Sequence, residues 1–313
     1  MSSLFITILN MSLTGAFVIS TICLVRLVLK KSPKIFLYCL WAVAGFRLAL
    51  PFSIESVFSL MPFDAQLITY VGDLPVAALP YSSSPLQMWV AIGSFVWLAG
   101  AILMILHGAV SLAILKSKLK EAVNVEANIY EAEMLKTPFV IGVFSPKIYL
   151  PAYLSARERE YIILHEKTHI RRRDHIVKFA AYFILCLHWF NPLAWLAFLL
   201  MSKDMEMSCD ERVLKELGGG DEIKKGYSSA LLSLAAERCV ISGSSLAFID
   251  SDVSSRVRNV LNMKRQSFMT LGVSMALVVV LSAGFAVDRI SAYVASHDVV
   301  AYQANLFAIF CCD

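Results

Sequence analysis

Long apolar segments constrain the fold of this chain more than any other feature. Of its 313 residues, 58% are hydrophobic, whereas soluble domains are usually about 45–50% apolar. A helix that crosses a bilayer needs about 20 mostly apolar residues. The stretches that meet or approach this length are about Leu4–Leu29, Ile35–Leu50, Met88–Leu115 and Phe268–Val287. The sequence therefore predicts a mostly α, polytopic membrane protein with about four transmembrane helices.

Basic residues predict the orientation of these helices, because short cytoplasmic loops carry an excess of Lys and Arg. Residues 26–34 hold four basic residues and no acid, whereas residues 51–87 hold three acidic residues and no base. We therefore expect both termini outside the cytoplasm. The predicted parts are three N-terminal helices (1–115), a cytoplasmic domain (116–266), a last transmembrane helix (267–288) and a short extracytoplasmic tail (289–313). The net charge of +4 follows from this topology and gives no reason to expect direct nucleic-acid binding.

The predicted cytoplasmic domain combines short strands with helices. The β-prone runs 123–130, 139–143 and 147–150 predict a small antiparallel sheet or hairpin. The sequence Ser-Ala-Arg-Glu at 155–158 is a capping box, which predicts a helix from Ala156 to about Arg173. The domain is thus expected to be α+β.

A further apolar stretch of about 26 residues follows this helix. Asn191-Pro192 interrupts it, and proline breaks a helix and restricts the residue before it. We expect a membrane-associated helical hairpin with its tip near Asn191, whose returning helix ends at about Leu217. Whether residues 176–200 enter the bilayer or lie on its surface stays open. A helix from Asp221 to about Glu237, a loop over 240–252 and a short basic helix over 254–265 should complete the domain.

The stretch His-Glu-Lys-Thr-His at 165–169 is the chemical motif of the chain. His165 and His169 are four residues apart and therefore share one face of a helix. Glu166 lies about 100° round from them. Two imidazoles that converge in this way suit a tetrahedral zinc ion, with a carboxylate beside an open position for water. The alternative is an exposed, charged helix whose histidines only contact solvent.

The returning helix supplies the other predicted site residues. Glu206 and Asp210 are again four apart, and a hairpin brings their face toward the histidines. We predict that His165, His169 and Glu206 bind Zn²⁺ and that the catalytic Glu166 takes the proton of the attacking water. Asp210 is expected to accept a hydrogen bond from a ligand histidine.

Two neighbours of these residues carry weaker expectations. Cys209 is expected to point away from the site and pack. Asp174 could support a ligand or form a charge pair at the helix end.

Six motifs together cover most of residues 35–265: Arg-Leu-Ala-Leu-Pro at 47–51, TPFVIGVFSPKIYLP, the HEKTH helix, HWFNPLAW, EMSCDERVL and RVRNVL. In this combination the chain resembles the BlaR/MecR family of antirepressor membrane metallopeptidases. The resemblance implies a gluzincin-like peptidase at the cytoplasmic membrane surface. In that family an outside signal provokes self-cleavage, and a DNA-binding repressor is then lost by proteolysis.

The resemblance also suggests how substrate binds. The strand at 139–143 would pair with an extended substrate as an edge strand, and the loop 242–251 is a candidate autoinhibitory or self-cleaved segment. This chain ends about 25 residues after its last predicted helix, so we expect no penicillin-binding sensor domain and no β-lactam sensing by acylation.

The function expected from the sequence is therefore a zinc-dependent membrane endopeptidase. Its expected partners are membrane lipids and a protein substrate, either a cytoplasmic repressor or the chain itself, and homodimerisation is left open. A quality-control protease of membrane proteins and a non-catalytic receptor scaffold are the alternatives. Glu166 favours an enzyme, because a scaffold needs no general base.

Overall fold

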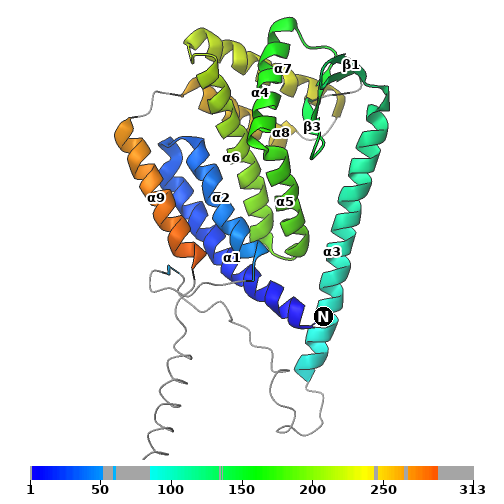
Figure 1. Cartoon of the computed structure of the whole chain (residues 1–313), viewed down its shortest axis with the longest axis vertical. Coiled ribbons are helices and arrows are strands. Elements are labelled where there is room, and N and C mark those ends of the chain that lie inside the picture. The colour runs from blue at the N-terminus through cyan, green and yellow to red at the C-terminus, as the bar shows by residue number, and fades with distance from the viewer. Residues whose placement is uncertain are drawn as a thin grey trace, which may run out of the picture.

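The computed structural model describes residues 2–51, 59–60, 85–133, 135, 137–242, 246–263 and 267–287. Helices α2 and α9 lie on one side of a central helical pair and α3 lies on the other, while α1 runs from α2 across to α3 (Figure 1). The bounds of these four helices are Ser2–Val28, Lys34–Ala49, Phe268–Ala286 and, for α3, Pro85–Lys118. The 3₁₀ turns η1 (Leu29–Lys31) and η4 (Leu119–Glu121) extend α1 and α3.

Three helices in the described ranges are long and apolar enough to cross a membrane, namely α1, α9 and the continuous helix over Met88–Glu121. The predicted second span, α2, has 16 residues, fewer than the roughly 20 that a simple crossing needs. The expected count of four spans is therefore not confirmed. Helix α2 is nevertheless part of the apolar core.

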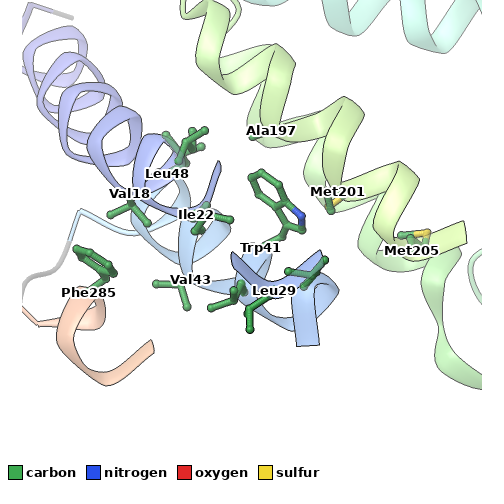
Figure 2. Close-up of a cluster of buried hydrophobic side chains, with 14 residues drawn as sticks. Val18, Ile22, Leu29, Trp41, Val43, Leu48, Ala197, Met201, Met205 and Phe285 are labelled. Atoms are coloured by element: carbon green, nitrogen blue, oxygen red, sulfur yellow. The ribbon is translucent and has the colours of Figure 1, made fainter. Parts of the chain in front are cut away.

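That core joins α1, α2, α6 and α9. Figure 2 shows Trp41 of α2 directed toward Ala197 and Met201 of α6, with Val18 and Phe285 on the opposite side of the cluster. Burial of such side chains stabilises a helix pair by roughly 1.5–3 kcal/mol per large apolar residue in water. Inside a bilayer, close packing replaces this hydrophobic term.

The predicted helical hairpin is present. Helix α5 (Asp174–Leu187) and helix α6 (Pro192–Glu216) are joined at Asn191. The side chain of Asn191 accepts a hydrogen bond from the Leu193 amide at 2.9 Å and donates to the Ser12 hydroxyl of α1 at 2.8 Å. The hairpin tip therefore lies beside α1, well away from the end of α1 at Val28.

Helix α3 packs against the other side of the hairpin. The Trp97 indole donates to the carbonyl of Leu187 at 2.8 Å, and the Trp189 indole donates to the carbonyl of Trp97 at 3.1 Å. A Cβ atom at Gly100 would lie 2.3 Å from the Trp189 ring. Glycine is thus required there for the close approach of α3 and the hairpin tip.

A four-stranded sheet has the order β1-β2-β4-β3. Its strands are Val123–Glu126, Ile129–Ala132, Phe139–Ile141 and Lys147–Pro151 in chain order. The prediction of an antiparallel sheet was wrong for one pair, because β2 and β4 are parallel. After β2 the chain first forms β3 at the edge of the sheet, and β4 then lies between β2 and β3. The alternation of apolar and polar residues along a strand does not reveal such a crossover.

Helix α4 (Ala156–Arg172) begins at the predicted capping box. The Ser155 amide donates to Glu158 Oε2 at 3.1 Å, and the Ser155 hydroxyl accepts from the Glu158 amide. The helix ends where Arg173 adopts a left-handed conformation with φ 58°. This single residue turns the chain directly into α5.

Two further helices cover the domain. Helix α7 spans Asp221–Ser242 and helix α8 spans Leu246–Leu261. The predicted loop over 240–252 was therefore wrong at both ends, because α7 extends to Ser242 and α8 already begins at Leu246. Residues 243–245, in the candidate self-cleaved segment, lie outside the described residues.

Candidate metal centre

The side chains of His165 and His169 converge from successive turns of α4. Their Nε2 atoms are 3.1 Å apart, and both residues are buried. Oε2 of Glu206, on α6, lies 3.4 Å from Nε2 of His165 and 3.6 Å from Nε2 of His169. Two donors bound about 2.05 Å from a tetrahedral zinc ion are about 3.3 Å apart. The three atoms thus have the mutual spacing that a zinc ion requires.

The far nitrogen of each imidazole has a partner that fixes its orientation. Nδ1 of His169 lies 2.7 Å from Oδ2 of Asp174, which is the first residue of α5. Nδ1 of His165 lies 2.8 Å from the hydroxyl of Tyr227, and that hydroxyl donates to Asp210 Oδ1 at 2.7 Å. Both Nδ1 atoms are therefore placed to carry the proton, which leaves each Nε2 lone pair directed at the centre of the site.

Asp210, predicted to accept a hydrogen bond from a ligand histidine, lies beside His165 but is linked to it through Tyr227. Its Oδ1 is 3.3 Å from Nδ1 of His165, and the Tyr227 hydroxyl is the closer partner of both groups. Asp174, for which the sequence left two readings open, contacts the ligand candidate His169. Tyr227 lies on α7. Its surroundings in the sequence are those of an ordinary core residue and did not mark it as part of the site.

Arg256 of α8 is the other member of the cluster that the sequence did not identify. Its Nε donates to Asp210 Oδ2 at 2.9 Å and its Nη2 to Asp210 Oδ1 at 2.8 Å. Its Nη1 is 3.4 Å from Oε2 of Glu206. The only sequence signal was its place in the RVRNVL motif, where a basic residue near a membrane reads equally well as a surface charge.

The charges around the site favour a cation at the two Nε2 atoms. Burial lowers the pKa of His165, but nearby Cys209 and Glu206 outweigh it and raise that pKa to about 10. Burial likewise opposes charge on His169, whose pKa is nevertheless well above its ordinary value because Asp174, Cys209 and Glu206 stabilise the charged ring. An environment that holds a proton so strongly also favours a metal ion in its place.

The pKa values of Glu166 and Glu206 are shifted in opposite directions. Burial raises the pKa of Glu166, which suits a group that must accept a proton. Burial also opposes ionisation of Glu206, but Arg256 and the two histidines outweigh it and hold its pKa well below the usual range. The surroundings thus favour the charged form of Glu206 and make Glu166 the more basic of the two carboxyl groups.

Cys209 lies nearer to the histidines than predicted. Its Sγ and the donor nitrogens of His165 and His169 are all within 4.8 Å of one another, so the expectation that it points away was wrong. The side chain is fully buried, and Sγ lies 3.6 Å from the backbone carbonyl of His165. Glu206 remains the better third donor, because its oxygen is within 3.6 Å of both Nε2 atoms.

A cavity of about 690 Å³ opens onto these groups. Phe139 and Val140 of β3 form one wall, and β3 has only β4 as a partner in the described sheet. Apolar residues of α6 and α7 line other walls; they include Leu199, Leu200, Leu231 and Leu234. The cavity thus places a sheet edge and apolar surface beside the candidate metal centre.

An HExxH helix that meets a carboxylate from a second helix is typical of metallopeptidases. Residues 6–260 match the family described as BlaR1 peptidase M56. The chain therefore belongs to this family of membrane metallopeptidases, as its motifs indicated.

Individual relatives match over shorter stretches. The regulatory protein BlaR1 of Bacillus licheniformis is 35% identical over 96 residues, which are 30% of this chain and 16% of that protein. The methicillin resistance mecR1 protein of Staphylococcus aureus is 29% identical over 130 residues, 40% of this chain and 22% of that protein. These alignments cover less than a quarter of the relatives' length.

Proposed function

We propose that this protein is a zinc-dependent endopeptidase of the cell membrane that hydrolyses peptide bonds at the cytoplasmic face. The observation that carries the proposal is the triangle of Nε2, Nε2 and Oε2 atoms with edges of 3.1, 3.4 and 3.6 Å. His165, His169 and Glu206 would hold the zinc ion. When bound, zinc supplies a Lewis acid that polarises the scissile carbonyl and acidifies water.

The chain's own residues perform the proton transfers. Glu166 follows the ligand His165 directly and lines the cavity with a buried carboxylate. It takes the proton of the attacking water and passes it to the leaving amine. Asp174 and the Tyr227–Asp210 pair hold the two histidines in the tautomer that leaves Nε2 free.

The cavity wall formed by β3 suits an extended peptide. An edge strand offers backbone N–H and C=O groups, and pairing with it reads the backbone of a substrate more than its side chains. Phe139 and Val140 bring this edge to the cavity that holds Glu166 and the ligand triangle. We therefore propose that substrate adds to β3 as a further strand.

The cytoplasmic placement rests on the distribution of charge. Four basic residues lie in residues 26–34, and Lys and Arg are abundant between α3 and α9. We propose the organisation given above, with the peptidase domain at 116–266 and both termini outside.

The relative in Bacillus licheniformis is named as a regulatory protein, and the relative in Staphylococcus aureus as a methicillin resistance protein. We propose that this protein acts in signal-regulated proteolysis, with a transcriptional repressor or its own chain as substrate.

The deciding experiment compares the purified wild type with Glu166→Gln and Glu160→Gln in nanodiscs. Zinc content is measured by elemental analysis, and cleavage of the chain itself and of a co-purified repressor by intact-mass spectrometry. We expect zinc in all three proteins and cleavage by the wild type and Glu160→Gln only, because Glu160 is exposed on the same helix. Well-folded wild type without zinc, or equal cleavage by Glu166→Gln, would contradict the proposal.

A further inference from the structure

Helix α2 contacts the helix that carries Glu206 on both sides of that residue. The Trp41 indole donates to Asp204 Oδ2 at 2.8 Å, and the Lys34 amide donates to Glu211 Oε2 at 3.0 Å. Asp204 is fully buried and also receives the guanidinium of Arg26 from α1 at 2.7 Å. Figure 2 shows the Trp41 ring between α2 and α6. The stretch of α6 that presents Glu206 is therefore fixed by polar contacts as well as by packing.

A second contact reaches the ligand candidates from the other direction. The Tyr38 hydroxyl of α2 donates to Asp174 Oδ1 at 3.2 Å, while Oδ2 of the same carboxylate is 2.7 Å from Nδ1 of His169. Arg172 lies over the Tyr38 ring at 5.1 Å, and its Nε is 3.3 Å from Asp174 Oδ2. One carboxylate thus connects a residue of α2 with the imidazole that is to bind the metal.

From these contacts we propose that Tyr38 is a positioning residue for the metal centre and acts through Asp174 on His169. The inference rests on the function proposed above and adds a residue that lies 131 positions before His169. Asp174 has two oxygens, and Tyr38 holds one while His169 contacts the other. Without the Tyr38 hydroxyl, one fewer contact restrains the carboxylate, and His169 is held less firmly in the orientation that suits zinc.

The same contact makes the metal centre sensitive to the position of α2. At the other end of α2, the buried Arg47 donates to the backbone carbonyls of Phe285 and Val287, at the end of α9. A displacement of α2 relative to α5 would lengthen the bond from Tyr38 to Asp174. The zinc affinity of the site then depends on the position of α2.

A double-mutant cycle tests this chain of contacts. The zinc dissociation constant is measured by competition with a chelator for the wild type, Tyr38→Phe, Asp174→Asn and the double variant in nanodiscs. We expect Asp174→Asn to weaken zinc binding about 10- to 100-fold and Tyr38→Phe, one contact further away, about 3- to 10-fold. The double variant should bind no more weakly than Asp174→Asn, because residues that act through one another are not additive. The absorption spectrum of bound Co²⁺ should change in Tyr38→Phe.

Tyr182→Phe is the matched control, since it removes a tyrosine hydroxyl that donates to the Met104 carbonyl at 2.9 Å, away from the metal centre. It should leave both readouts unchanged. Wild-type affinity and cobalt spectrum in Tyr38→Phe, or full multiplication of the two losses, would overturn the inference. If Asp174→Asn does not fold, Asp174→Glu takes its place in the cycle. Zinc binding without peptide cleavage by the wild type would defeat the proposed function alone, because these readouts do not depend on cleavage.

Discussion

At the scale of single residues, Arg256 determines how much negative charge the candidate centre can hold. Asp210 is fully buried, and two of its contacts come from the Arg256 guanidinium. Two further buried acids, Glu166 and Asp174, lie around the histidines. A buried carboxylate without a partner is strongly unfavourable, so Arg256 is needed for the fold of the site before any metal binds.

We expect Arg256→Gln to lower the free energy of unfolding by about 3–5 kcal/mol, the usual cost of leaving one member of a buried ion pair alone. Arg256→Lys should recover part of this loss, since it keeps the charge but not the paired hydrogen bonds. Denaturation with urea in detergent measures both. Arg258→Gln, an exposed neighbour on α8, is the control, and an equal loss in that variant would refute the role given to Arg256.

The residues of the site divide by whether their partners are close in the sequence. His165, Glu166 and His169 are predictable because they follow helical spacing on a single capped helix. Tyr227 and Arg256 contact His165 across 62 and 91 positions. Such contacts depend on how α7 and α8 fold back over α4, which no local pattern encodes. The position of Cys209 was predicted wrongly for the same reason, because the rotation of α6 about its axis relative to α4 decides where the thiol lies.

At the scale of elements, the N-terminus of α4 fixes the position of the HExxH motif (residues 165–169) along the helix. The capping box at Ser155 satisfies amide groups that would otherwise lack partners at the helix start. His165 lies ten residues further, less than three turns away. A defined start to α4 therefore holds the histidines in register with Glu206.

We expect Ser155→Ala to destabilise the protein by about 1 kcal/mol, the typical cost of losing a side-chain cap. Ser155→Thr keeps the acceptor and should remain within a few tenths of a kcal/mol of the wild type. Thermal unfolding followed by circular dichroism compares the three proteins. Equal midpoints for Ser155→Ala and Ser155→Thr would show that the cap contributes nothing.

Elements with strong end signals were the predictable ones. The capping box and Asn191-Pro192 both mark helix starts in the structure. The parallel pairing of β2 with β4 depends on a crossover, and the extension of α7 to Ser242 runs past the predicted end at Glu237. For the sheet, the order of the strands decided the outcome, and local propensity does not encode that order.

At the scale of the whole molecule, the hairpin of α5 and α6 bears on membrane placement. Its tip at Asn191 hydrogen-bonds to Ser12, in the middle of a helix that is long enough to span a bilayer. The hairpin also exposes large apolar side chains; they include Phe179, Phe183 and Leu196. This surface suits lipid better than water.

We therefore expect the hairpin tip to lie inside the bilayer. In a background without native cysteines, a cysteine introduced at Leu193 should resist a membrane-impermeant maleimide from both sides. One introduced at the half-buried Leu217, past the end of α6, should react from the cytoplasmic side only. Labelling at position 193 at the rate seen at position 217 would place the hairpin on the membrane surface.

The hairpin also sets the order in which the parts of the candidate metal centre are made. His165 and His169 leave the ribosome before α5 and α6, and Glu206 follows the turn at Asn191. A nascent chain that has not yet completed and folded the hairpin holds two of the three proposed donors, and it lacks Arg256 as well. The candidate metal centre therefore assembles late in biosynthesis, after most of the segments that surround it have been made.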